Sequence, residues 1–119
     1  MVWILLKSIE MKITRLPRGN AQFPGEKDPG DIVVLSNNDI FVWSKGIWML
    51  LGGRFLKDSV RDWLLDYLKD GWPTPSDAKF DLGYMVELAG ENSEDRKWTN
   101  MALQNTLKLS ETLQTERIS

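Results

Sequence analysis

The sequence predicts a small α+β domain, in which an antiparallel three-stranded β-meander is followed by two or three α-helices. Three observations support this class. Runs of β-branched and aromatic residues alternate with turn residues over positions 31–53, an apolar stripe with helical spacing follows at 55–70, and helix-start signals recur through 74–115. The chain has 119 residues, of which 42% are hydrophobic, so we expect one domain with one core over residues 1–119.

The first thirty residues combine a short strand with an arm. Residues 11–16 have the pattern of a first strand, and Met11 is an alternative start of translation, which would make the first ten residues dispensable. Six prolines and glycines then fall within residues 17–30. Proline removes backbone donors and glycine adds chain entropy, so this segment is predicted to be an extended arm.

The meander is expected at residues 31–53, with two-residue turns at Asn37 and Asn38 and at Lys45 and Gly46. Both faces of its strands are apolar. One face carries Ile32, Val34, Ile40, Val42, Ile47 and Met49; the other carries Val33, Leu35, Phe41, Trp43, Trp48 and Leu50. An antiparallel sheet usually leaves one face in water. We therefore expect the helices to cover one face and the N-terminal segment or a second chain to cover the other.

Residues 55–70 form the clearest predicted helix. Its apolar stripe consists of Leu56, Val60, Trp63, Leu64, Tyr67 and Leu68. Residues 74–115 are expected to be mainly helical. Thr74 and Pro75 are typical of a helix start, whereas apolar residues alternate from 78 to 88 as in a strand, so helix and strand both stay open there, with helix preferred. Asn92 or Ser93 is expected to cap a last helix that frays after Thr115.

Cysteine and histidine are both absent from the chain. Their absence excludes disulfides, thiolate chemistry and zinc sites built from these residues, and removes the commonest general base near neutral pH. The sequence also contains no phosphate-binding, dinucleotide-binding or nucleophile motif. We therefore expect no enzyme, no catalytic residue, no metal site and no cofactor.

The net charge of −2 gives no overall attraction to nucleic acid, and the basic cluster of Lys7, Lys12, Arg15 and Arg18 is sparse, so nucleic acid is not the expected partner. The opening apolar run is too short to span a bilayer, and no membrane association is expected. Asp58, Asp62 and Asp66 share one face of the predicted helix. Such a face is typically solvated, and it is also a possible contact for a protein partner.

Six residues are tryptophan, a large share for so short a chain. Apolar area that a small domain cannot bury usually lies in an interface, where tryptophan is a favoured anchor. We therefore predict a homo-oligomer or a subunit of a larger assembly. The expected protein-interface residues are Phe41, Trp43, Trp48, Trp72 and Trp98.

Residues 30–52 resemble the β-hairpin units of phage tail-fibre and other virion proteins. The matching positions are Gly30, Asp31, Asp39, Phe41, Val42, Trp43, Gly46, Trp48 and Leu51. Two features depart from that pattern: Lys45 stands where those units have Asp or Asn, and no second copy of the unit follows. The resemblance implies a structural, oligomeric unit without catalytic residues.

The expected function is therefore that of a non-enzymatic, phage-type structural or assembly protein, such as a capsid, neck or tail accessory, located in the virion. The alternative is a small acidic inhibitor or adaptor in the host cytoplasm, for example an anti-defence or regulatory protein. In that case the contact face would be formed by Asp58, Asp62 and Asp66.

Overall fold

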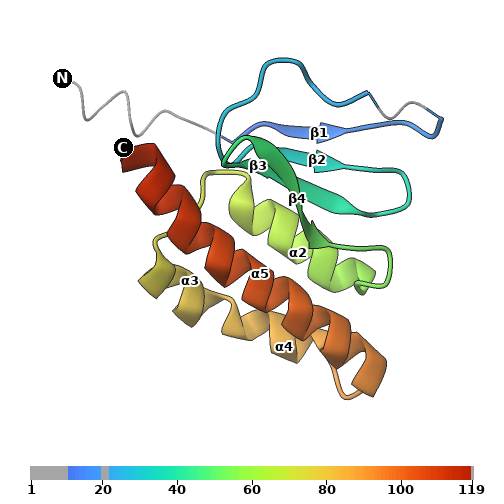
Figure 1. Ribbon diagram of the computed structural model, residues 1–119. Helices are drawn as coiled ribbons and strands as arrows, with labels where there is room; N and C mark the ends of the chain where they lie inside the picture. Colours follow the sequence, from blue (N-terminus) through green and yellow to red (C-terminus); the bar gives the residue numbers. More distant parts are fainter. Residues whose placement is uncertain (1–10, 20–21, 119) are drawn as a thin grey trace.

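The structure is a computed structural model that describes residues 11–19 and 22–118. Predictions about residues 1–10, including the role of Lys7 and of the segment before Met11, lie outside the described residues. The described chain has an α+β fold, with a mixed sheet whose inner face is covered by helices (Figure 1).

The sheet has the strand order β1 (Ile13–Arg15), β2 (Ile32–Val34), β3 (Ile40–Ser44) and β4 (Ile47–Gly52). The strands from β2 to β4 form the expected antiparallel part, but β1 is a fourth strand that pairs in parallel with β2, with Ile13 opposite Ile32. The prediction of a three-stranded antiparallel meander was therefore wrong. Parallel neighbours need a connection that crosses the sheet, and the described residues 16–19 and 22–31 belong to it.

This connection contains the proline- and glycine-rich arm, which crosses the outer face of the sheet. The Phe23 ring meets Phe41 and Trp48 edge-on, with ring centroids 5.7 and 5.2 Å apart. Lys27 Nζ lies 4.6 Å from the centroid of the Trp43 ring. The N-terminal segment thus covers part of the second apolar face, as the apolar pattern predicted.

The turns of the sheet depend on residues that tolerate positive φ. Lys45 and Gly46 have φ of 53° and 78°, which fits the predicted two-residue turn between β3 and β4. Asn38 also has a positive φ of 75°. The loop there is longer than predicted, because the N–H of Leu35 donates to the Asp39 carbonyl and leaves residues 36–38 between them.

The helical half consists of α2 (Asp58–Leu68), the short helices α3 (Pro75–Asp81) and α4 (Gly83–Ala89), and α5 (Ser93–Ile118). α2 begins three residues later than predicted, because residues 53–56 form a turn closed by the Leu56 N–H on the Gly53 carbonyl. The predicted caps are present. Thr74 Oγ1 accepts from the Asp77 N–H, and Asn92 Oδ1 accepts from the next helix.

Residues 78–88 are helical, and the strand alternative is wrong. The positions that face the core are buried with helical spacing: Ala78, Leu82, Met85 and Ala89. The positions between them that made the apolar pattern alternate are exposed: Phe80, Tyr84 and Val86. The alternation therefore reflects a second apolar face on a helical segment, which the sheet does not cover.

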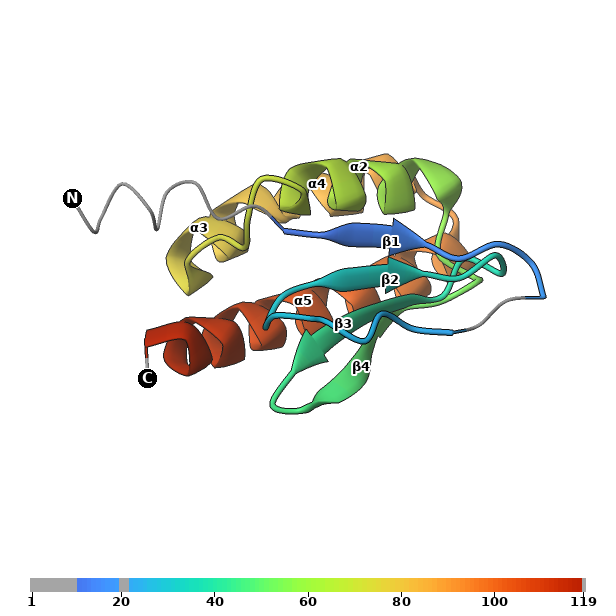
Figure 2. The same cartoon turned by 90° about the horizontal axis from the view of Figure 1, so that it is seen from above.

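The molecule has three layers (Figures 1 and 2). α2 and α5 pack on the inner face of the sheet, and α3 and α4 pack against them on the side away from the sheet. The core lies between the sheet and the helices and includes Ile32, Val42, Leu51, Val60, Leu64 and Leu113. α5 continues to Ile118, three residues beyond the Thr115 at which fraying was expected, and the Glu116 carboxylate accepts hydrogen bonds from Ser44 Oγ and the Lys45 N–H.

Candidate protein-docking surfaces

The outer face of the sheet brings together three of the five predicted interface residues. Phe41, Trp43 and Trp48 share this face; Trp43 is opposite Trp48 in the register, and their rings meet edge-on with centroids 5.2 Å apart. All three are half-buried, because the arm covers them. Leu50 continues the row and is 52% exposed. We call Phe23, Phe41, Trp43, Trp48 and Leu50 the outer aromatic face.

The outer aromatic face ends at the strand β4, which lies at the edge of the sheet and pairs with β3 alone among the described strands. An edge strand presents backbone groups to which another chain can add. Part of this edge is used within the chain, since Asn105 Nδ2 on α5 donates to the Leu51 carbonyl at 3.1 Å. Between β4 and α5 a cavity of about 260 Å³ is lined by Lys45, Met49, Leu50, Asn105, Lys108, Leu109 and Thr112.

The other two predicted interface tryptophans lie elsewhere and contact their own chain. The Trp72 indole N–H donates to the Gly30 carbonyl at 2.9 Å and packs against the core. Trp98 stacks on Phe55 with ring centroids 5.0 Å apart, and its N–H donates to Glu94. The structure does not bring them together with the outer aromatic face, and their contact with a partner remains a prediction.

The predicted acidic face is exposed on α2, but basic neighbours balance it. Asp58 and Asp62 both pair with Arg61, at 3.2 and 2.9 Å. Asp66 pairs with Lys69 at 2.8 Å, and this hydrogen bond, together with the charge of Asp66, raises the pKa of Lys69. The three carboxylates thus lie on one solvated face with two cations among them.

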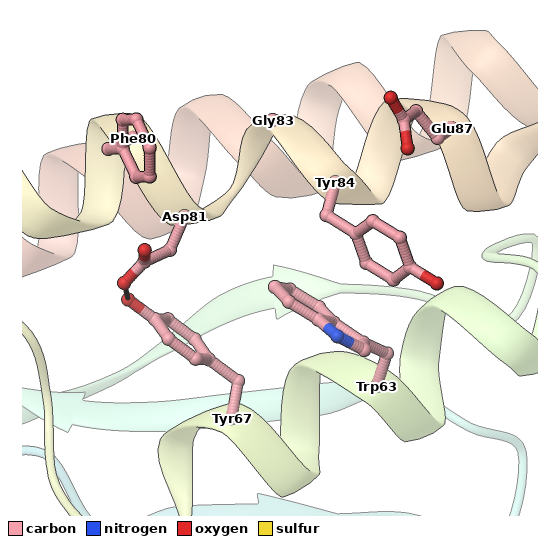
Figure 3. A pocket seen from close by; sticks show the side chains of 7 residues that line it. All are labelled: Trp63, Tyr67, Phe80, Asp81, Gly83, Tyr84 and Glu87. Carbon is pink, nitrogen blue, oxygen red and sulfur yellow. Dashed lines mark hydrogen bonds between the residues drawn. The ribbon is translucent and has the colours of Figure 1, made fainter.

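A further surface, which the sequence analysis missed, is a groove between α2 and the pair α3–α4 (Figure 3). Its cavity measures about 690 Å³ and is lined by Trp63, Tyr67, Phe80, Asp81, Gly83, Tyr84 and Glu87, which we call the aromatic groove. Trp63 and Tyr67 belong to the apolar stripe of the predicted helix at 55–70, but both are only half-buried. The signal that could have found this groove was the apolar alternation over residues 78–88.

The rings of the aromatic groove are ordered by mutual contacts. Trp63 and Tyr67 stack almost in parallel, at 8° with centroids 5.2 Å apart, and Tyr84 tilts toward Trp63 from α4 at 5.5 Å. The Tyr67 hydroxyl donates a 2.6 Å hydrogen bond to Asp81 Oδ2. Burial, and then the hydrogen bond and charge of Asp81, raise the pKa of Tyr67 far above its usual value, so the phenol stays neutral.

The described residues contain no group of three acidic side chains placed to hold a metal ion. None of the helices described here combines the length and the apolar character that a membrane crossing requires. Comparison of the chain with protein-family models, curated proteins and solved structures gave no match.

Proposed function

We propose that the chain is a non-enzymatic structural or assembly protein of phage type, which docks on neighbouring subunits through the outer aromatic face. The observation that carries this proposal is the row of aromatic side chains on β3 and β4, which extends beyond the arm to Leu50, 52% exposed at the edge of the sheet. Aromatic anchors beside an edge strand suit an interface that combines ring packing with strand addition.

The positions that resemble virion hairpin units support a structural role. Gly30 has φ of +98°, and a Cβ there would lie 2.8 Å from Met11 Sδ and 3.0 Å from Trp72 Cδ1. Asp31 accepts hydrogen bonds from the N–H groups of Lys12 and Asp28, and thereby joins the residue before β1 to the last part of the arm. Asp39 accepts from the N–H of Arg54 after β4. These residues shape the sheet and the arm and leave the rings of β3 and β4 as the contact surface.

The proposal places the protein in virus particles, and purification of particles tests this directly. Particles released by cells that carry the gene are separated on a density gradient and analysed by mass spectrometry. The chain is expected in the particle fractions in a fixed ratio to the major coat subunit, and a Leu50→Lys change is expected to remove it. Detection only in the soluble fraction, together with a monomeric purified chain, would contradict the proposal.

The second candidate function is an acidic inhibitor or adaptor that binds one host protein through Asp58, Asp62 and Asp66. Their exposure on one helix face supports it, at side-chain values of 80% for Asp58, 63% for Asp62 and 74% for Asp66. Under this alternative, salt weakens partner capture, and Asp58→Lys with Asp62→Lys abolishes it. Capture that both changes leave intact would exclude the acidic face as the contact.

A further inference from the structure

The aromatic groove lies on the helical side of the molecule, on different elements from the outer aromatic face. Phe80 from α3 is 86% exposed and Tyr84 from α4 is 48% exposed. Trp63 and Tyr67 from α2 form the wall opposite Asp81 and Tyr84, whereas Phe80 lies at the outer rim (Figure 3). A single exposed aromatic residue is ordinary, but several that gather around one hollow are typical of a binding surface.

The charges of the aromatic groove have one sign. Its two ionisable groups besides the tyrosines are Asp81 and Glu87, and no lysine or arginine is among its lining residues. Asp81 Oδ2 accepts from Tyr67, whereas Oδ1 has no hydrogen-bond partner among the residues that the structure describes. Glu87 is exposed at the rim and likewise forms no ion pair within that part of the chain. The groove therefore offers two carboxylates beside flat aromatic rings.

This combination matches the chemistry of one side chain in particular. A guanidinium is planar, stacks on aromatic faces and donates hydrogen bonds to carboxylates, and it loses less hydration energy than an ammonium group when it does so. We propose that the aromatic groove binds an arginine-bearing segment of a partner protein. The guanidinium packs on the outward-facing surfaces of the groove rings, which already contact one another, and pairs with Asp81 or with Glu87 at the rim.

The probe is a synthetic acetylated and amidated peptide that alternates arginine with serine. Its control carries citrulline, which keeps the shape of arginine and lacks the charge. Both are titrated into the isotopically labelled full chain and followed by the amide and indole NMR signals. The arginine peptide is expected to shift the Trp63 indole and the α4 amides, and the citrulline peptide is expected to bind at least about fivefold more weakly.

Matched variants separate the groove from general attraction to an acidic protein. Glu87→Gln is expected to weaken binding about twofold to fivefold, as for an exposed charge pair. Glu91→Gln, in the turn after α4, is expected to leave binding unchanged. Phe80→Ala and Tyr84→Ala are expected to weaken binding by a similar or larger factor, and Met101→Ala, an exposed position on α5, is their control. Asp66→Asn tests the acidic face and is expected to have no effect.

Equal affinity for the citrulline peptide would overturn the proposal, as would equal losses for Glu91→Gln and Glu87→Gln. Shifts of the groove signals that depend on the concentration of the chain itself would assign the groove to a second copy and would also overturn it. The Leu50→Lys variant is expected to bind the peptide normally. The peptide test of the aromatic groove is therefore independent of whether the outer aromatic face is a docking surface.

Discussion

The hydroxyl of Tyr67 and the carboxylate of Asp81 join α2 to the end of α3 through a hydrogen bond of 2.6 Å. This bond spans one end of the aromatic groove and orients the ring that stacks on Trp63. Because burial and Asp81 raise the pKa of Tyr67, the bond has a donor across the whole range in which the fold is ordinarily studied.

Replacement of Tyr67 by Phe removes this hydrogen bond and keeps the ring. The free energy of unfolding is expected to fall by about 1 kcal/mol near neutral pH, measured by urea denaturation. Tyr84→Phe is the matched control, since the Tyr84 hydroxyl makes no hydrogen bond with a described residue. Equal losses in the two variants would contradict a specific role for the bond between Tyr67 and Asp81.

The same variant gives a pH prediction. Tyrosine in the unfolded chain titrates near pH 10, and the pKa of Tyr67 in the folded chain is higher. Its contribution to stability is thus complete below about pH 10 and decreases as the pH rises toward the folded-state pKa. The difference in stability between wild type and Tyr67→Phe should shrink above about pH 10. A difference that stays constant or grows there would refute the assignment.

Glu116 fastens the C-terminal end of α5 to the turn between β3 and β4. Its carboxylate accepts from Ser44 Oγ at 3.1 Å and from the Lys45 N–H at 3.0 Å, and Ser44 is fully buried. Glu116→Ala is expected to lower the free energy of unfolding by about 1–2 kcal/mol and to speed amide exchange in the last turn of α5. Glu111 is exposed, so Glu111→Ala is the control. If amide exchange in the last turn of α5 is equally fast in Glu116→Ala and Glu111→Ala, the contacts of Glu116 do not hold the helix end.

Any residue larger than glycine at position 30 is expected to destabilise the fold. Its φ of +98° and the close approach of Met11 and Trp72 predict a loss of about 1–3 kcal/mol for Gly30→Ala, measured by thermal or urea unfolding. Gly25 in the same arm has open space around its Cβ position and no positive φ. Gly25→Ala should therefore be neutral or slightly stabilising, and similar losses at both positions would be inconsistent with this account.

Thr99 on α5 is buried, and its hydroxyl has no hydrogen-bond partner among the described residues. Thr99→Val is expected to raise the free energy of unfolding by about 1 kcal/mol, because it removes a desolvated polar group at nearly constant shape. Thr106 is equally buried but donates to the Ala102 carbonyl at 2.6 Å. Thr106→Val is therefore expected to give a lower free energy of unfolding than Thr99→Val. If urea denaturation shows the opposite order, the Thr99 hydroxyl has a hydrogen-bond partner.

The sequence predicted the elements of the fold better than their arrangement. Runs of β-branched residues and the turns at Lys45 and Gly46 located β2, β3 and β4, since local preferences and turn chemistry act over a few residues. The parallel pairing of β1 with β2 depends on a connection whose residues Phe23 and Lys27 lie on the outer face. Apolar periodicity indicates which side chains are buried but contains no information on strand direction or neighbour.

The candidate surfaces were predictable in part. Phe41, Trp43 and Trp48 share a face because alternate residues of paired strands point to the same side of a sheet. Trp72 instead donates a hydrogen bond to the Gly30 carbonyl, 42 positions away in the chain, and local sequence patterns do not predict such a contact. The aromatic groove was missed because Trp63 and Tyr67 fit the inward stripe of α2. Both residues line the groove where α2 meets α3 and α4, and periodicity does not specify how helices pack on one another.

If the outer aromatic face docks on another subunit, the oligomeric state of the purified chain depends on Leu50 at the edge of that face. Sedimentation velocity is measured on the wild type, on Leu50→Lys and on Met101→Lys, which adds the same charge at a similarly exposed residue, with 52% and 49% exposure in the wild type. The wild type and Met101→Lys are expected to assemble, and Leu50→Lys is expected to be a monomer. Assembly of all three alike would contradict docking through this face, as would a wild-type monomer that also fails to join particles.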